Sequence, residues 1–247
     1  MTVNIIWMYP DLLNLYGDRG NIMALSRICE SLGATANITR IDSVKADIDF
    51  ENTDIMLFSP GELSTVSVIT EALRQKTDKI KEYIENDRYI LSIGTSAAIF
   101  GNTVTRRDRP SFKGLGIGQY DMAEKEAIYG DDLIYSCTPV DLEWEVAGNQ
   151  IQIVDTILKE GAEAFGKIIY GYGNMHDGRE GSRYKNLITT NALGPALVKN
   201  PWIIADIISD ILKKKGHETQ PTELDFEIEK KSLNAIKRFN HNKKTNL

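Results

Sequence analysis

The chain has few cysteines, histidines and prolines: its 247 residues include two, three and seven of them respectively. Two cysteines, Cys29 and Cys137, are too few for a disulfide framework or a four-ligand zinc site, and they favour a reducing compartment, the cytoplasm. The start lacks the features of a signal peptide, and no run approaches the ~18 apolar residues of a membrane span. A net charge of −6 gives no general attraction for nucleic acid. We therefore expect a cytoplasmic protein with no membrane insertion, no nucleic-acid partner, no metal and no cofactor.

Short apolar runs alternate with longer helical stretches through the first half of the chain, which is typical of a βαβ protein with a mostly parallel sheet. The apolar spacing predicts an amphipathic helix over Asn14–Leu32, and a charged helix is expected over Val66–Asn86. The expected buried strands are Val3–Met8, Ala36–Ile41, Asp54–Phe58 and Tyr89–Ile93.

The second half differs, because short apolar runs there are separated by Gly, Asn and Asp, as in an antiparallel addition to the sheet. A further helix is expected over Asn200–Lys215, with Pro201 in its first turn and lysines in its last. The strands expected in this half are Leu133–Tyr135, Leu142–Val146, Ile151–Val154 and Gly166–Tyr170.

From Thr222 onward the chain is charged, beginning acidic and ending basic. A solvated helix with a frayed end is favoured over a nucleic-acid-binding arm. We therefore divide the chain into a main domain, residues 1–216, and a charged C-terminal helix with a basic tail, residues 217–247. The basic residues of the tail are Lys230, Lys231, Lys237, Arg238, Lys243 and Lys244.

Candidate sites follow the predicted strands, because ligands of doubly wound sheets bind beyond the carboxyl ends of the strands. The first is Tyr9–Asn21, YPDLLNLYGDRGN, which opens a helix. It is either an anion site built from helix N-terminal amides or a simple turn capped by Asp11 or Asn14. The second, Ser59–Thr65, contains a Pro-Gly turn that leads into the next helix.

The third segment, Ser92–Gly101, passes from strand to helix through small residues, as a nucleophile elbow does. Gly94 stands at the bend and is followed by Thr95 and Ser96. A hydroxyl nucleophile at either position needs a base, and His176 in a glycine-rich loop is the candidate. The alternative is that the small residues serve close packing and that His176 belongs to an ordinary turn.

Together these segments resemble the GatD group of CobB/CobQ-like class I glutamine amidotransferases. The most specific match is Tyr9–Asn21, which nearly reproduces that family's YPDLxNxYGDRGN opening. The resemblance implies a flavodoxin-like α/β fold with a mixed, mostly parallel sheet and helices on both faces. Further matches in family order are Gly114–Ile117, Gly171–Asn174, Tyr184–Leu187 and Gly194–Pro201.

The resemblance implies a glutaminase in which a cysteine, activated by a histidine, releases ammonia from glutamine. A partner ligase, MurT, uses this ammonia to amidate the D-glutamate of the lipid II stem peptide. The family's ICGGYQxxG elbow, laid on Ile93–Gly101, places its cysteine at Gly94, and its GTYLHGP segment places its histidine at Leu193. Its glutamine-holding arginine falls at Ala127, and its GGGxDxEQ turn falls on Ser59–Val66. The inherited catalytic residues are therefore absent.

Neither cysteine is a convincing replacement, because Cys29 is expected in the core and Cys137 on a later strand. Three hypotheses remain open. The first is a catalytically degenerate subunit in peptidoglycan biosynthesis that still binds a MurT-like Mur ligase as a heterodimer. The second is an enzyme of altered mechanism that uses Thr95, Ser96 or His176. The third is an amidotransferase subunit whose ammonia is supplied free or by another chain.

Overall fold

The centre of the molecule is a six-stranded sheet with the strand order β11-β12-β4-β3-β1-β2. The computed structural model describes residues 1–245. Within them, four neighbouring pairs run parallel and β11 is antiparallel to β12 at one edge. The mixed, mostly parallel sheet is thereby confirmed. Its strands are β1 (Thr2–Met8), β2 (Thr35–Ile41), β3 (Ile55–Phe58), β4 (Tyr89–Ile93), β11 (Ser182–Tyr184) and β12 (Leu187–Thr190).

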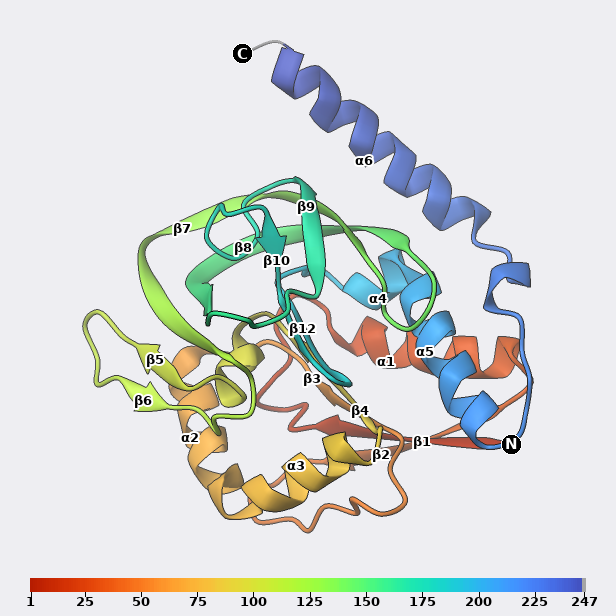
Figure 1. Ribbon diagram of the computed structural model, residues 1–247, viewed down its shortest axis with the longest axis horizontal. Coiled ribbons are helices and arrows are strands. Elements are labelled where there is room, and N and C mark those ends of the chain that lie inside the picture. The colour runs from red at the N-terminus through yellow and green to blue at the C-terminus, as the bar shows by residue number, and fades with distance from the viewer. Residues whose placement is uncertain (246–247) are drawn as a thin grey trace.

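Helices cover both faces of this sheet, as Figure 1 shows. The alternation of side chains along β1 divides its residues between two cores. Val3, Ile5 and Trp7 pack with α1, α4 and α5, whereas Ile6 and Met8 pack with α2 and α3. These helices are α1 (Arg19–Ser31), α2 (Leu63–Leu73), α3 (Thr77–Glu85), α4 (Ala196–Lys199) and α5 (Pro201–Lys214).

A second sheet has the strand order β10-β9-β7-β5-β6, with β8 also paired to β7. Three of the short strands expected in this half were wrong in extent. Leu133–Tyr135 is part of the long strand β7, Ile151–Val154 is part of the long strand β8, and Leu142–Val146 spans the end of the turn between them and the start of β8. Buried Gln150 continues β8 where Gly148 and Asn149 suggested a break between two strands. The strands are β5 (Thr103–Thr105), β6 (Phe112–Lys113), β7 (Tyr120–Cys137), β8 (Trp144–Leu158), β9 (Gly166–Tyr170) and β10 (Arg179–Glu180).

The first helix starts later than the expected Asn14. Tyr16 and Gly17 adopt left-handed conformations, with φ of 62° and 81°, and this turn cannot be part of an α-helix. The N-cap position belongs to Asp18, so the capping role expected of Asp11 or Asn14 was wrong. The side chain of Asp11 instead accepts a hydrogen bond from Arg40.

The helix expected over Val66–Asn86 is divided by η1 (Arg74–Lys76), a short 3-10 turn. Arg74 reaches out of this turn to the carbonyl oxygens of Lys113 and Gly114. After β4 the chain forms the 3-10 helix η2 (Gly94–Ile99) rather than an α-helix.

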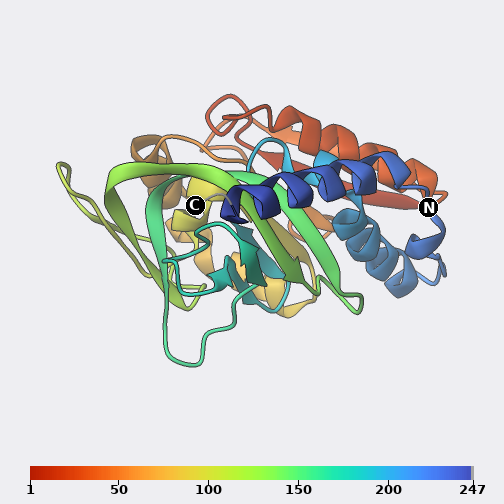
Figure 2. The same ribbon diagram turned by 90° about the horizontal axis from the view of Figure 1, so that it is seen from above.

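The C-terminal helix α6 (Glu227–Thr245) follows η3 (Pro221–Glu223) and lies over the second sheet (Figure 2). It is solvated on one face only, because Leu233 and Asn240 on the other face are buried. Asn240 donates to Asp132, and Lys237 and Lys243 form ion pairs with residues of β8 and β7. The frayed end falls partly on residues 246–247, which lie outside the described residues.

Among residues 1–245, no helix is both long enough and apolar enough to cross a lipid bilayer.

Candidate functional site

The turn after β4 has the sharp geometry of an elbow. Gly94 has a φ of 60°, in the left-handed region that side chains disfavour. A Cβ atom added at Gly94 would lie 2.9 Å from Leu193 Cδ2 and 3.2 Å from Pro60 Cβ. The fold thus brings Gly94 and Leu193 together, although they are distant in the sequence. Leu193 is 3% exposed and occupies the space into which a side chain at position 94 would extend.

The two hydroxyl groups beside this turn form hydrogen bonds with backbone groups. Thr95 Oγ1 donates to Gly61 O at 2.6 Å and accepts from Gly61 N at 3.0 Å. Ser96 is fully buried, and its Oγ lies 2.8 Å from Ser92 Oγ and 3.0 Å from Phe58 O. The hydroxyls therefore stabilise the turn and join it to the loop after β3.

The opening motif, residues 9–21, forms a wall of this site. Leu15 N donates to Pro60 O, and a Cβ at Gly61 would lie 2.6 Å from Leu13 Cδ2. On the other side, a Cβ at Gly20 would lie 2.8 Å from Pro195 Cγ. These close approaches require glycine at both positions, and they pack the motif against the loops that precede α2 and α4.

Asp18 lies buried within this motif. Asn21 Nδ2 donates to its Oδ1 at 2.8 Å, whereas its Oδ2 has no hydrogen-bond partner among the described residues. Burial raises the pKa of Asp18 from 3.8 to about 7. A carboxyl group here disfavours the anion-binding interpretation of the motif, since a bound anion would repel the ionised form.

Asp18 makes stability dependent on pH. The folded chain keeps the Asp18 proton between about pH 4 and about pH 7, where the unfolded chain has released it, so stability falls as pH rises through this range. We expect Asp18→Asn to raise the melting temperature by about 5 °C at pH 8 and to lose this advantage near pH 4. Differential scanning calorimetry at several pH values measures this, with the exposed Asp108→Asn as control. An equal effect of Asp18→Asn at both pH values contradicts the assignment.

His176 and Ala127, the other sequence candidates, lie elsewhere on the surface. His176 is exposed with a φ of 60°, and its ring packs 5.5 Å from that of Tyr172. The structure gives it no contact with Thr95 among the described residues. Ala127 is exposed in the irregular part of β7 between Glu124 and Tyr129.

Both cysteines are buried and unpaired. Burial raises the pKa of the Cys29 thiol to about 12 and that of Cys137 further above its ordinary value. At neutral pH both are therefore protonated and unreactive, as expected for core residues. Within the described chain, no group of three or more His, Cys, Asp or Glu residues is arranged to hold a metal ion.

Glu180, which no sequence pattern indicated, positions the segment before Leu193. Glu180 is fully buried and accepts hydrogen bonds from Thr190 Oγ1 at 2.7 Å, Asn191 N at 2.6 Å and Asn191 Nδ2 at 2.9 Å. Burial raises its pKa. The sequence around Glu180 contains no motif that indicates this role, because its hydrogen-bond partners, Thr190 and Asn191, lie at the end of a different strand, β12.

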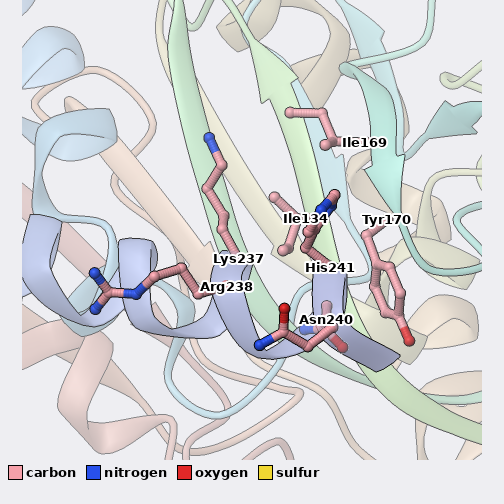
Figure 3. A pocket seen from close by; sticks show the side chains of 8 residues that line it. Ile134, Ile169, Tyr170, Lys237, Arg238, Asn240 and His241 are labelled. Carbon is pink, nitrogen blue, oxygen red and sulfur yellow. The ribbon is translucent and has the colours of Figure 1, made fainter. Parts of the chain in front are cut away.

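A cavity of about 460 Å³ lies between α6 and the second sheet (Figure 3). Ile134 and Ile169 line it from the sheet, and Figure 3 shows Arg238 pointing away from Tyr170. Lys237 is already paired with Glu145. None of the elements that form the elbow contributes to this cavity, so the two are separate features.

The mostly parallel sheet, the elbow after β4 and the helices on both faces define an α/β protein with the fold of class I glutamine amidotransferases. The fold is similar to the structure of PurLQS from Thermotoga maritima, with a TM-score of 0.52 and 11% sequence identity. That likeness covers 87% of this chain and 100% of the other, and at this identity it concerns the fold alone.

No protein-family model matches the sequence. Over 222 residues the chain is 31% identical to the lipid II isoglutaminyl synthase (glutamine-hydrolyzing) subunit GatD of Streptococcus pneumoniae, covering 88% of this chain and 84% of that protein. It is 30% identical over 246 residues to the protein of the same name from Staphylococcus aureus, covering 98% of each. The chain belongs to the GatD family.

Proposed function

We propose that this chain is a non-hydrolysing GatD-type subunit that binds a MurT-like Mur ligase in the amidation of lipid II. Its GatD relatives are named as glutamine-hydrolysing subunits of lipid II isoglutaminyl synthase. The observation that carries the proposal is the closed elbow, in which Leu193 fills the space beside the glycine at position 94. The main chain there resembles that of a nucleophile elbow, but the residue at the bend, Gly94, carries no nucleophilic side chain.

The chemistry supports this reading. Hydrolysis of an amide by covalent catalysis needs a nucleophile and a base, and loss of either lowers the rate by several orders of magnitude. Glycine supplies no nucleophile at position 94, and Leu193 supplies no base. Enzymes with a nucleophile elbow use a backbone N–H from a loop such as the one after β3 to stabilise the oxyanion. Here the Gly61 N–H of that loop already donates a hydrogen bond to Thr95 Oγ1.

The contacts of Thr95, Ser96 and His176 give little support to an altered mechanism. Ser96 is buried among carbonyl oxygens, and Thr95 is held by both backbone groups of Gly61. A hydroxyl becomes a useful nucleophile only beside a base. Among the described residues, the contacts of His176 are with Tyr172, which belongs to its own loop.

Ammonia release tests the proposal. We expect the chain, alone or with its MurT-like ligase, to release no ammonia from glutamine above the uncatalysed rate. The two proteins should nevertheless co-purify, and amidation of lipid II by the pair should depend on added ammonium rather than on glutamine. A coupled glutamate dehydrogenase assay and mass spectrometry of the lipid II product measure the two quantities.

The possible contrary results separate the alternatives. Ammonia release at an enzymatic rate that is lost in Thr95→Ala or Ser96→Ala would establish the altered mechanism instead. Absence of any complex with the ligase would overturn the binding role. A relative that hydrolyses glutamine, such as the Staphylococcus aureus GatD, is the positive control for the assay.

A further inference from the structure

A cavity of about 520 Å³ opens beside the opening motif, between the first turn of α1 and the edge of the sheet. We call it the Trp7 cavity. Its wall combines apolar and cationic side chains, whereas its acidic member, Asp11, is already paired with Arg40. The lining residues are Trp7, Pro10, Asp11, Asn14, Arg19, Ile22, Met23, Ile38 and Arg40.

Two polar groups of this wall, the Trp7 indole N–H and the Arg19 guanidinium, have no hydrogen-bond or ion-pair partner among residues 1–245. Trp7 is 7% exposed, and its indole Nε1–H has no hydrogen-bond partner in the described part of the chain. A buried donor of this kind costs free energy unless an acceptor reaches it. Arg19 is exposed, and no carboxylate among residues 1–245 pairs with it. Among residues 1–245, the cavity wall therefore offers one exposed positive charge without a carboxylate partner, that of Arg19.

Exposed apolar side chains lie in the cavity wall and on the loop beside it. Met23 is 64% exposed at the cavity, and Leu12 and Leu15, on the same loop as Pro10 and Asn14, are 44% and 39% exposed. Large apolar side chains exposed on one loop and on the adjoining helix are typical of a protein-binding surface. An aliphatic partner surface would cover them.

We infer that the Trp7 cavity and the loop residues beside it are the surface that docks the Mur-ligase partner, through an acidic segment of the ligase with aliphatic side chains next to its carboxylate. This inference rests on the proposed function and adds the location and chemistry of the contact. The partner's carboxylate complements Arg19, and its aliphatic neighbours cover Met23. Charge complementarity favours an acidic partner segment over a basic one, because the acidic side chain in the wall, Asp11, is already paired with Arg40, whereas Arg19 has no such partner among residues 1–245.

Charge reversal at the cavity tests the inference. Arg19→Glu places an acidic residue in the first turn of α1, where the helix dipole favours it, so the fold should be retained. We expect Arg19→Glu and Met23→Glu each to raise the Kd for the purified MurT-like ligase at least tenfold in isothermal titration calorimetry. Arg27→Glu on the same helix is the control, because Arg27 is exposed and does not line the cavity, and it should change the Kd less than twofold. Circular dichroism and melting temperature show whether each variant is folded.

The outcomes separate this inference from the function on which it rests. If the wild-type chain binds the ligase and both cavity variants bind within twofold of it, the docking surface is wrong and the proposed function stands. If the wild-type chain does not bind the ligase at all, both are overturned. The affinity of the wild type should also weaken with added salt, and this dependence should be smaller in Arg19→Ala; an unchanged salt dependence contradicts the role of Arg19.

Discussion

Gly94→Ala should destabilise the protein by about 2–3 kcal/mol, because the new methyl group has an unfavourable φ and too little space. The residue has a φ of 60°, and its Cβ would lie 2.9 Å from Leu193 Cδ2 and 3.2 Å from Pro60 Cβ. Leu193 is buried and Pro60 is stiff, so neither gives way without strain. Urea unfolding measures the loss.

A double-mutant cycle isolates the contact with Leu193. Leu193→Ala alone should cost about 2–5 kcal/mol through the cavity that it leaves. In the Leu193→Ala background the added methyl at position 94 has room, so the double variant should be about 1 kcal/mol or more better than the sum of the two single changes. Additive effects would show that Leu193 does not fill the elbow.

Gly161→Ala is the matched control for the backbone contribution. Gly161 has a φ of 77°, and nothing lies within 4 Å of a Cβ added there. The change should therefore cost only the conformational part, about 1 kcal/mol. A cost at Gly161 equal to that at Gly94 would mean that the close contacts at the elbow contribute nothing.

The sequence was sufficient to predict β1, β2, β3 and β4 of the main sheet, because each follows a strand-like pattern of apolar residues, but it did not predict β11 or β12. All five residues of β4 are buried, and so are all four of β3. The bend at Gly94 was also predictable from the small residues that follow a strand. The burial of Cys29 in the core and the position of Cys137 on a later strand are both confirmed.

The parts that escaped prediction depend on contacts between distant segments. Gln150 is polar and lies between two expected strands, yet it continues β8, and its side chain donates a hydrogen bond to the carbonyl oxygen of Gly173 in the loop after β9. The helix from residue 227 looked fully solvated, because the buried Asn240 is polar and its partner Asp132 lies in β7. The spacing of apolar residues and the amino-acid composition carry no information about hydrogen-bond partners that are distant in the sequence.

At the candidate site, too, the sequence could not predict contacts between segments that are distant in the chain. A sequence can indicate that the chain lacks a cysteine at an expected bend, but not what fills the resulting space. The contact of Leu193 with the elbow and the double hydrogen bond of Thr95 to Gly61 come from loops after three different strands. The arrangement of those loops is a property of the folded sheet.

Glu180→Ala should strongly destabilise the segment that carries Leu193, with a loss of about 3–4 kcal/mol and a melting temperature lowered by roughly 10 °C. Glu180 is fully buried and is the acceptor for the backbone N–H and side-chain amide of Asn191 and for the hydroxyl of Thr190. Removing the carboxyl leaves the buried Asn191 N–H without its acceptor and takes one acceptor each from Asn191 Nδ2 and Thr190 Oγ1, which keep contacts with Asn174 and Tyr135. Each unpaired buried donor costs about 1–3 kcal/mol.

Glu180→Gln distinguishes the hydrogen bonds from the charge. A glutamine keeps one acceptor oxygen for Asn191 N or Thr190 Oγ1 but directs an amide group at the remaining donor, so it should lose less stability than alanine, about 1–2 kcal/mol. Because burial raises the pKa of Glu180, the folded chain favours its neutral form more than the unfolded chain does, and the disadvantage of glutamine should shrink as the pH rises. The exposed Glu160→Ala should leave the melting temperature unchanged. If Glu180→Ala melts together with Glu160→Ala, the segment before Leu193 is held by its strand alone, and the contact that closes the elbow does not depend on this carboxylate.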